Sequence, residues 1–591
     1  MNHRLVVHAG LFPGVALAAL LVLAAPARAA WPINGTPVCT VVTDQRYPEI
    51  IPDGSGGAIV TWADYRSGTS NDIYAQHVLS SGAPDPAWPL DGLVLCAAVD
   101  GQIYPTLASD GAGGAIVAWY DYRSGTSYDI YAQHVTASGS VDPGWPVNGR
   151  ALCTASGDQT LPRVLSDGAH GAIVAWMGPA DYPVSDISAQ HVLATGLVDP
   201  AWPVNGRSIC SAPGAQQYPR LVTDGAGGAI ITWEDVRGGT YYDIYAQRVQ
   251  ASGSVDPAWP ANGRAVCTAA NSQLDPAILS DGAGGALISW SDFRNTFGDV
   301  YAQHVLASGV ADPAWPANGR ALCSAANHQY TTALVSDGST GAIVAWQDYR
   351  NGTDFNIYAQ HVLISGVVDA GWPVDGTALT VAANTQESPA IVTDRAGGAV
   401  VAWLDSRDLA TTSSDVYAQH VLASGLVDAT WPAGGKALCT APNFQQSAVT
   451  APDGAGGAIA AWTDLRNENT TGVNIFAQRI GADGTIGGAV AGVSPGARAT
   501  GVAFAPASPN PARFAVTLDF VLPRDAQVRL GIFDISGATV RELFAGRRGA
   551  GTQAEGWDLR TANGKLAHAG MYFARLEVEG QRFVQRFAVT R

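Results

Sequence analysis

The sequence predicts an all-β chain, in which an eight-bladed β-propeller of four-stranded blades precedes a small β-sandwich. A block of about 57 residues occurs eight times between Trp31 and Gly481. Each copy carries four short apolar segments, separated by turns rich in glycine and aspartate. No segment shows the apolar period of 3.6 residues that marks a helix. A fixed-period array of four-stranded units is typical of a propeller.

Two tryptophans mark each copy, and the second follows the first by 31 residues every time. The first set is Trp31, Trp88, Trp145, Trp202, Trp259, Trp315, Trp372 and Trp431, and the second is Trp62, Trp119, Trp176, Trp233, Trp290, Trp346, Trp403 and Trp462. We expect the second set to fill the wedges between blades, where losing one such side chain costs about 3–5 kcal/mol.

The copy over residues 88–144 shows the expected strands in order. A first apolar segment ends at Cys96, and Tyr104–Ser109, Ala115–Trp119 and Asp129–Val135 follow. The turn between the second and third strands contains three glycines, which adopt positive φ at little cost.

The two ends of the array predict a closed ring. It begins with a lone opening segment, Trp31–Cys39, and ends with Asn474–Ile480, which no tryptophan segment follows. We expect these two segments to pair, because closure removes exposed sheet edges. An open β-solenoid is the alternative.

The N-terminus has the features of a secretory signal peptide. Arg4 begins a short basic region, Val15–Ala25 is apolar, and Ala27-Arg28-Ala29 is a small-residue cleavage site. The apolar run is too short to span a bilayer. We therefore predict a signal peptide over residues 1–29, no membrane span elsewhere, and a secreted or cell-surface protein.

The charge of the chain excludes one class of partner. The net charge is −17, charged residues make up 14%, and the only lysines are Lys436 and Lys565. Binding nucleic acid through its phosphates requires basic patches, so no nucleic-acid partner is predicted.

Cysteine and histidine each recur at one position of the copy. The cysteines are Cys39, Cys96, Cys153, Cys210, Cys267, Cys323 and Cys439, with Thr380 in the seventh copy, and the histidines are His77, His134, His191, His304, His361 and His420. Equivalent cysteines in neighbouring blades should lie beyond the roughly 7 Å between Cα atoms that a disulfide needs, so we expect buried free thiols. Equivalent histidines should diverge, so no metal site is predicted.

An Asp-x-Arg pattern follows the second tryptophan in seven copies. It reads Asp64-Tyr65-Arg66, Asp121-Tyr122-Arg123, Asp235-Val236-Arg237, Asp292-Phe293-Arg294, Asp348-Tyr349-Arg350, Asp405-Ser406-Arg407 and Asp464-Leu465-Arg466, and a second Asp such as Asp72, Asp129 or Asp243 often comes after it. Paired carboxylates can be catalytic or bind Ca²⁺. A residue repeated around a ring is expected to be structural instead, here an ion pair that organises the hairpin.

All length differences between copies fall in the loop that carries this pattern, and therefore on one face of the ring. That face is either the binding face or free of constraint. Its aromatic residues Tyr65, Tyr122, Phe293 and Tyr349 are the candidates for a ligand-binding rim, or they pack inside the hairpins. The third copy lacks the pattern and has Met177–Pro183 in its place. This difference fits either a special function of that copy or sequence drift without a function.

The repeat resembles known propellers. Residues 110–135 contain Asp-Gly-Ala-Gly-Gly-Ala-Ile-Val-Ala-Trp, then Asp-Tyr-Arg, then Asp-Ile-Tyr-Ala-Gln-His-Val, a pattern similar to the repeats of secreted bacterial propeller proteins. The stretch ending in Asp-Ile-Tyr is also similar to blades of the Tol-system periplasmic propeller, and that resemblance implies protein partners. The turn before Trp119 is similar to a sialidase Asp-box, but the Ser-x-Asp-x-Gly-x-x-Trp spacing is not met.

The last part of the chain has a different pattern. Residues 30–483 are assigned to the propeller, 484–505 to a linker rich in glycine and alanine, and 506–591 to the final domain. Its predicted strands are Arg513–Leu522, Gln527–Asp534, Thr539–Phe544, Thr552–Leu559, Met571–Val578 and Arg582–Thr590. Such short strands in roughly 85 residues favour a small β-sandwich.

Motifs in this domain resemble two overlapping families. Pro509-Asn510-Pro511, Phe533–Gly537 and Gly570-Met571-Tyr572 are similar to the type IX secretion sorting domain and to the Ig-like domain of flagellar hook-capping proteins. The resemblance implies an Ig-like domain that directs export through a secretion machinery or attaches the protein to the cell surface. The alternative is an accessory sandwich without a targeting role.

Three functions remain open. The sequence favours a secreted or surface-displayed scaffold that binds a protein or glycan through one propeller face, because catalysis needs a few unlike groups at one place and a uniform array does not offer them. No catalytic residue, cofactor or metal ligand is predicted. The alternatives are an extracellular polysaccharide hydrolase or lyase, which requires blade-specific polar residues along the central channel, and a purely structural surface protein.

Overall fold

The computed structural model describes residues 31–179, 184–339, 341–409 and 411–487 and, in the last part of the chain, 503–504, 512, 516–522, 524, 526–535, 537–548, 551–563, 565–579 and 581–590. All regular elements of these residues are β-strands. The chain forms two compact units that divide between Val493 and Ser494. The predicted signal peptide lies outside the described residues.

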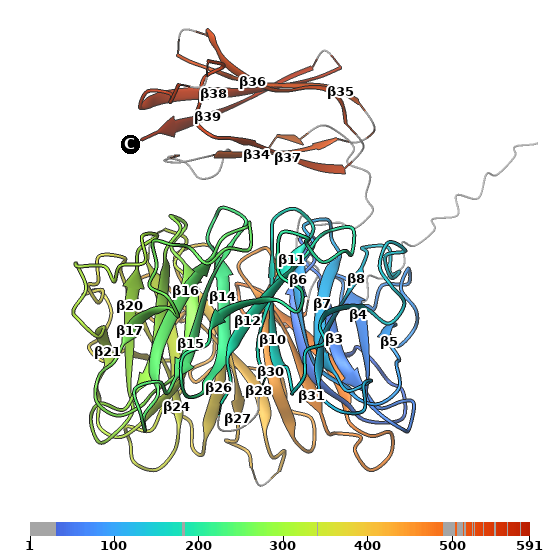
Figure 1. The fold of residues 1–591 in the computed structure, drawn as a ribbon, viewed down its shortest axis with the longest axis vertical. Helices are drawn as coiled ribbons and strands as arrows, with labels where there is room; N and C mark the ends of the chain where they lie inside the picture. The colour runs from blue at the N-terminus through green and yellow to red at the C-terminus, as the bar shows by residue number, and fades with distance from the viewer. Residues whose placement is uncertain are drawn as a thin grey trace, which may run out of the picture. The chain divides into compact units, whose positions relative to one another are not determined.

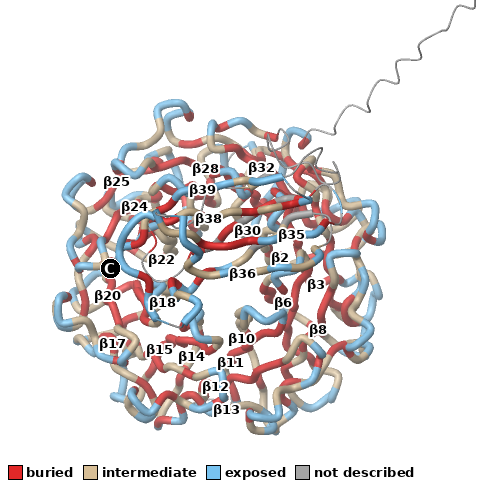
Figure 2. Tube along the Cα trace, turned by 90° about the horizontal axis from the view of Figure 1, so that it is seen from above, coloured by how far each residue is buried: buried red, intermediate tan, exposed pale blue. Residues whose placement is uncertain are grey.

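The described residues of the first unit form eight antiparallel four-stranded sheets. The sheets stand side by side around a common axis, with their first strands at the centre and their fourth strands at the rim (Figure 2). Figure 1 shows the same strands from the side. This is the arrangement of a β-propeller, so the predicted all-β propeller is confirmed.

Each sheet contains four strands, which follow one another from the axis outward. The innermost strands are β2 (Gln45–Pro52), β6 (Gln102–Ser109), β10 (Thr160–Ser166), β14 (Gln216–Thr223), β18 (Gln273–Ser280), β22 (Gln329–Ser336), β26 (Gln386–Thr393) and β30 (Gln445–Pro452). The second strands are β3 (Ala58–Asp64), β7 (Ala115–Asp121), β11 (Ala172–Met177), β15 (Ala229–Asp235), β19 (Ala286–Asp292), β23 (Ala342–Asp348), β27 (Ala399–Asp405) and β31 (Ala458–Asp464). The third strands are β4 (Asp72–Val78), β8 (Asp129–Val135), β12 (Ile187–Val192), β16 (Asp243–Val249), β20 (Asp299–Val305), β24 (Asn356–Val362), β28 (Asp415–Val421) and β32 (Asn474–Ile480). The outermost strands are β5 (Leu93–Cys96), β9 (Arg150–Cys153), β13 (Arg207–Cys210), β17 (Arg264–Cys267), β21 (Arg320–Cys323), β25 (Thr377–Ala378), β29 (Lys436–Cys439) and β1 (Thr36–Pro37).

The start of the array completes the last sheet. β1 pairs with β32, with Thr36 opposite Ala477, and the Val38 amide donates to the Ile475 carbonyl oxygen at 2.8 Å. The expected closure of the ring is therefore confirmed, and the open solenoid is wrong. The ring also extends to Gly487, past the predicted end at residue 483, because the Gly487 amide donates to the Arg479 carbonyl oxygen.

The tryptophans at the end of the second strands fill the space between sheets, as expected. Trp62 is fully buried in a cluster that joins β3 to Ala461 of β31 and to Ile475 of β32. The turns that join first and second strands are held by aspartate. The carboxylate of Asp53 accepts hydrogen bonds from the amides of Ser55 and Gly57, and a Cβ at Gly57 would lie only 2.4 Å from the Val78 carbonyl oxygen.

The second unit contains two antiparallel sheets. One has the order β33-β34-β37, with β33 (Ala503–Phe504), β34 (Val516–Leu522) and β37 (Gly551–Trp557), and the other has β36-β35-β38-β39, with β35 (Ala526–Phe533), β36 (Thr539–Arg548), β38 (Gly570–Val578) and β39 (Gln581–Val589). One buried cluster takes residues from both sheets, including Phe520, Trp557 and Leu576. The two sheets therefore form a sandwich.

One strand of this unit begins before residue 506. β33 lies inside the stretch predicted as a linker, residues 484–505, because Phe504 pairs with Phe520 and packs against the sandwich core. The motif at Pro509-Asn510-Pro511 lies outside the described residues.

Candidate active site at the axis of the ring

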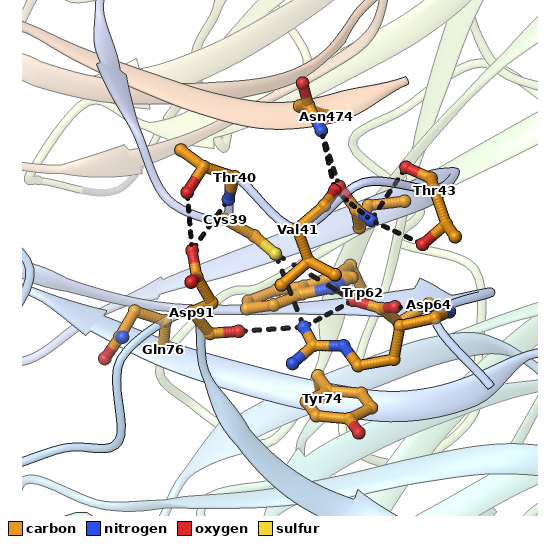
Figure 3. Close-up of polar contacts among 12 residues, drawn as sticks. Cys39, Thr40, Val41, Thr43, Trp62, Asp64, Tyr74, Gln76, Asp91 and Asn474 are labelled. Atoms are coloured by element: carbon orange, nitrogen blue, oxygen red, sulfur yellow. Dashed lines mark hydrogen bonds and ion pairs between the residues drawn. The ribbon is translucent and has the colours of Figure 1, made fainter. Parts of the chain in front are cut away.

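The repeated Asp-x-Arg pattern builds the same internal hub in each sheet that has it. In the first sheet, Trp62 Nε1 donates to Asp64 Oδ2 at 2.8 Å, and Arg66 Nη2 donates to the same oxygen at 2.6 Å. The Arg66 guanidinium also covers the Tyr74 ring at 3.7 Å and lies 3.3 Å from the Cys39 sulfur. Figure 3 shows the Trp62, Asp64 and Tyr74 side chains close to Cys39 of the opening segment. The hub is structural, as the sequence predicted.

The second aspartate of the pattern stands beside the first. Asp72 pairs with Asp64 across β3 and β4, and burial and the charge of Asp64 raise the pKa of Asp72 to about 6. The cysteines next to the hubs are buried, and burial raises the pKa of both Cys39 and Cys96 to about 12. These thiols are therefore protonated and unreactive.

The recurring histidines bridge two carboxylates at the opposite end of the sheets. His77 places Nε2 at 2.9 Å from Asp53 Oδ2 and Nδ1 at 2.8 Å from Asp85 Oδ2. Carboxylates only accept hydrogen bonds, so both ring nitrogens carry protons and the ring is cationic. Burial lowers the pKa of His77, but the two carboxylates raise it more, to a value above the usual one.

The innermost strands bend at the face that carries the variable loops. Each one has a β-bulge near its start, for example between Arg46 and Glu49, where β2 lies opposite the end of β3. The bulge residue takes a left-handed conformation in every sheet, such as Tyr47 at φ 59°. A bulge redirects side chains, and here it turns them toward the axis, on the same face as the loops between second and third strands.

The copies differ from one another at this bulge. The residues at and just after it read Tyr47-Pro48-Glu49, Tyr104-Pro105-Thr106, Leu161-Pro162-Arg163, Tyr218-Pro219-Arg220, Asp275-Pro276-Ala277, Thr331-Thr332-Ala333, Ser388-Pro389-Ala390 and Ser447-Ala448-Val449. We call these residues the axial ring. Its charged side chains are Glu49, Arg163, Arg220 and Asp275. Glutamate and aspartate each occur in one sheet, and arginine occurs in two neighbouring sheets. The axial ring is thus where a uniform array becomes asymmetric.

A cavity of about 270 Å³ opens within the axial ring. Its walls come from four successive innermost strands, β30, β2, β6 and β10, and include Tyr47, Glu49, Tyr104 and Arg163. We call it the axial cavity. The Glu49 side chain remains 37% exposed and the Arg163 side chain 31% exposed, so both are open to a ligand.

The charges of the axial ring act on one another. Arg163 Nη1 lies 3.9 Å from Glu49 Oε1. Desolvation raises the pKa of Glu49, while Arg163 and Arg220 lower it, and the net effect is a raised pKa. Desolvation and the charge of Arg163 lower the pKa of Arg220 to about 10, although Glu49 and Asp275 act in the opposite direction.

A further carboxyl group supports the bulge of the fifth sheet. Glu234, at the end of β15, accepts a hydrogen bond from the Asp275 amide at 2.7 Å. Burial raises the pKa of Glu234 to about 7, and the charge of Asp275 adds to the increase. Desolvation also raises the pKa of Asp275, and Arg220 lowers it. In the sixth sheet Gln347 makes the equivalent bond to the Ser388 amide.

Stacked tyrosines lead away from the axial cavity. The Tyr47 and Tyr104 rings lie 4.0 Å apart, and Tyr104 stacks on Tyr120 at 5.3 Å. Tyr120 meets Tyr128 edge-on at 5.0 Å, and Tyr128 contacts Tyr122 at 4.9 Å. A hydrogen bond to Tyr47 raises the pKa of Tyr104 to about 12, so this side chain is uncharged.

The four residues predicted for the rim occupy different surroundings. Tyr122 ends the run of tyrosines that begins at the axial cavity. Phe293 stacks on Tyr330 at 5.6 Å, and Tyr349 contacts Phe355 at 5.0 Å. Tyr330 and Phe355 are themselves 5.9 Å apart, so Phe293 and Tyr349 belong to one cluster. Tyr65 is 40% exposed.

Sequence reasoning missed the axial ring. The sequence contains one indication of it. The copies differ from one another at residues 47–49, 104–106 and the equivalent positions, close after Gln45 and Gln102. The third copy, whose loop lies partly outside the described residues, contributes Arg163 to the ring.

Among the described residues, no group of three or more His, Cys, Asp or Glu side chains is arranged to hold a metal ion. None of these residues belongs to a helix with the length and apolarity that a bilayer crossing requires.

Comparison with known proteins found solved structures of low sequence similarity. An endo-arabinase from Bacteroides thetaiotaomicron is 12% identical, with 43% of this chain and 92% of the other covered and a TM-score of 0.26. An α-L-arabinofuranosidase from Fusarium graminearum is 12% identical, with 57% and 99% covered and a TM-score of 0.32. PorZ, a surface component of the type IX secretion system of Porphyromonas gingivalis, is 13% identical, with 93% and 75% covered and a TM-score of 0.25. No protein-family model and no curated protein matches the chain.

These findings contradict the expected binding scaffold without catalysis. The similar structures include an arabinase and an arabinofuranosidase, which are of the class named in the alternative expectation, a polysaccharide hydrolase. The physical reason for the error lies in the axial ring. The array is uniform at its consensus positions, but blade-specific charged residues are gathered at the axis, where the copies differ. The likeness concerns the fold alone, so any chemistry has to follow from these side chains.

Proposed function

We propose that the protein is a secreted or surface-displayed enzyme that hydrolyses glycosidic bonds of an extracellular polysaccharide in the axial cavity. The observation that supports this most is Glu49. It is the carboxyl group of the axial cavity, its pKa is raised, and stacked tyrosines stand beside it. A carboxylic acid with a raised pKa keeps its proton to a higher pH, and it can give that proton to the oxygen of a leaving sugar.

A second carboxylate is needed for hydrolysis, and we propose Asp275, which belongs to the axial ring but not to the walls of the axial cavity. The innermost strands follow one another around the axis, so β18, which carries Asp275, stands opposite β2, which carries Glu49. Arg220 is within electrostatic reach of both carboxyl groups. In the proposed reaction Glu49 gives its proton to the glycosidic oxygen as the C–O bond breaks. Asp275 takes a proton from the water that adds to the sugar carbon.

Other residues would position the substrate or the acids. Tyr47 and Tyr104 offer flat apolar surfaces for sugar rings. Glu234 is a positioning residue, because it holds the amide of Asp275 rather than facing the cavity. We propose that the rim residues Tyr65, Tyr122, Phe293 and Tyr349 contact more distant sugars, since their loops lie on the face where the axial cavity opens.

The domain assignment forms part of the proposal. We propose an eight-bladed propeller, an Ig-like sandwich over residues 506–591 and a signal peptide over residues 1–29. The sandwich would attach the enzyme to the cell surface or direct its export, as the motifs at Phe533–Gly537 and Gly570-Met571-Tyr572 suggest.

The test is a polysaccharide panel with neutral and anionic members, incubated with the full chain and analysed for new reducing ends. We expect cleavage of at least one member, and we expect Glu49→Gln to lower the rate by about 100-fold or more, the usual contribution of a general acid. Glu387→Gln is the matched control. Glu387 is exposed at the start of β26, on the same face, and the variant should keep full activity.

Two results would overturn the proposal. One is a wild-type protein that cleaves no member of the panel, and the other is a Glu49→Gln variant as active as the wild type. An ultraviolet-absorbing unsaturated product would show elimination instead of hydrolysis, and would also refute it.

A further inference from the structure

Two arginines of the axial ring occupy the same position in neighbouring sheets. Arg163 follows the bulge of β10, and Arg220 follows the bulge of β14, and these two strands are in contact. The two guanidinium groups are close enough for their charges to repel each other. This repulsion is unfavourable as long as no anion is bound between them. The chain as a whole is acidic, with a net charge of −17. Two arginines placed side by side at its axis therefore require a reason.

Other arginines of the propeller have close partners, which are carboxylates or, for Arg150 and its equivalents on the outermost strands, a backbone carbonyl oxygen. Arg66 and its equivalents bind the hub aspartates, as at Asp64. Arg248 and Arg479 replace the bridging histidine and bind carboxylates, such as Asp224 at 2.9 Å and Asp453 at 2.6 Å. The charges of these side chains are therefore balanced within the propeller.

Arg163 and Arg220 are different. Among the described residues, the one ion pair of Arg163 is with Glu49, at 3.9 Å, which is too long for a hydrogen bond. Arg220 Nη1 donates to the adjacent Pro219 carbonyl oxygen at 3.1 Å, which supplies no negative charge. Most of the N–H groups of the two guanidiniums therefore remain available at the axis.

The proposed reaction makes this imbalance larger. Glu49 acts as an acid only when it is protonated, and in that form it gives Arg163 no counter-charge. Arg163 then has no counter-charge, although Arg220 still has Asp275 within electrostatic reach. An anionic group on the substrate would be stabilised between the two arginines. A sugar carboxylate or sulfate matches the planar fork of a guanidinium, which binds two oxygens at once.

We infer that the substrate is an anionic polysaccharide, and that Arg163 and Arg220 together bind a carboxylate or sulfate group on the sugar next to the cleaved bond. The placement of the charged group next to the cleaved bond rests on the proposed function. It adds the substrate class and two specificity-determining residues. A neutral glycan would leave Arg163 without a counter-charge when Glu49 is protonated.

The test is calorimetric binding of three oligosaccharides of equal length to the full chain carrying Glu49→Gln, which prevents turnover. The probes are an oligogalacturonate, a sulfated chondroitin oligosaccharide and a neutral arabino-oligosaccharide. We expect one of the two anionic probes to bind at least about tenfold more tightly than the neutral one. Which of them does so identifies the charged group.

Variants locate the site. Arg163→Ala and Arg220→Ala should each weaken the binding of the anionic probe about tenfold or more. The affinity for the neutral probe should stay unchanged. Arg220→Lys keeps the charge without the fork and should give an intermediate loss. Arg395→Ala is the matched control, because Arg395 is exposed in the turn between β26 and β27, at the opposite face, where it donates to the Gly454 carbonyl oxygen.

Equal affinity for charged and neutral probes would overturn the inference, and so would anion binding that both alanine variants retain with unchanged unfolding midpoints. The two proposals fail in different ways. Tight anion binding without any cleavage by the wild type refutes the hydrolase and leaves the anion site. Cleavage that depends on Glu49 but is confined to neutral polysaccharides refutes the anion site and leaves the hydrolase.

Discussion

Replacing Asp129 by Asn should stabilise the ring at neutral and alkaline pH and leave it unchanged in acid. Asp129 is buried and stands directly opposite Asp121 across β7 and β8. Burial and the charge of Asp121 raise the pKa of Asp129 from 3.8 to about 6. A carboxyl group whose pKa is higher in the folded state than in the unfolded state costs stability once it ionises, so stability falls as the pH rises from about 4 through 6.

The magnitude follows from the size of this change. Each pH unit of pKa increase corresponds to about 1.4 kcal/mol, so the increase to about 6 corresponds to about 3 kcal/mol at pH 8. Solvent near the loop screens part of this, and we expect Asp129→Asn to raise the free energy of unfolding by about 1–2 kcal/mol at pH 8. Two other sheets already have asparagine at this position, since Asn356 and Asn474 stand opposite Asp348 and Asp464.

The assay is urea unfolding followed by tryptophan fluorescence at pH 8 and pH 4. Trp557 is the only tryptophan after Trp462, so the signal reports mainly on the ring. The reverse change, Asn356→Asp, is the matched control and should destabilise the ring at pH 8 but not at pH 4. The reasoning is refuted if Asp129→Asn lowers stability at pH 8, or if its effect is the same at both pH values.

Three further outcomes are expected. His134 has a raised pKa because Asp110 and Asp142 outweigh its burial, so its stabilising charge is present below about pH 6.5 and lost as the pH rises through the higher folded-state value. His134→Arg introduces the side chain that Arg248 supplies at the equivalent position, so it should reduce the fall in melting temperature between pH 6 and pH 9, and an unchanged fall would contradict the charged bridge. A chain that starts at residue 41 lacks β1 and Trp31 and leaves the β32 edge unpaired; it should melt lower and form oligomers in light scattering, whereas an unaltered monomer would argue against closure. Arg220 lowers the pKa of Glu49, so Arg220→Ala should move the alkaline limb of the kcat profile to higher pH, and a limb that stays or moves down would remove Glu49 as the acid.

The sequence predicted the propeller well because its determinants are local and repeated. The spacing of Trp62 and its equivalents, the Asp-Gly turns and the lone segment at Trp31–Cys39 each report on one sheet or one junction. They required no knowledge of how distant sheets face one another. The hub around Asp64 and Arg66 was predictable for the same reason, since both residues lie in one hairpin.

The axial ring was not predicted because its residues are distant in sequence and meet only at the axis. The argument that equivalent positions on separate blades diverge is correct for the third strands, where His77 and His134 bind only their own aspartates. It is wrong for the innermost strands, which converge. Residues such as Glu49 and Arg163 therefore act together although a full copy of the repeat lies between their own copies. The histidine bridges were missed for a different reason, because Asp53 and Asp85 were not considered as partners of His77.

The position of a bound substrate tests the central claim most directly. A crystal of the Glu49→Gln variant soaked with the oligosaccharide that binds most tightly should show sugar density in the axial cavity, stacked on Tyr47 or Tyr104, with its charged group on Arg163 and Arg220. Density on the outer loops or on the C-terminal sandwich, with the axial cavity free of sugar, would contradict the account.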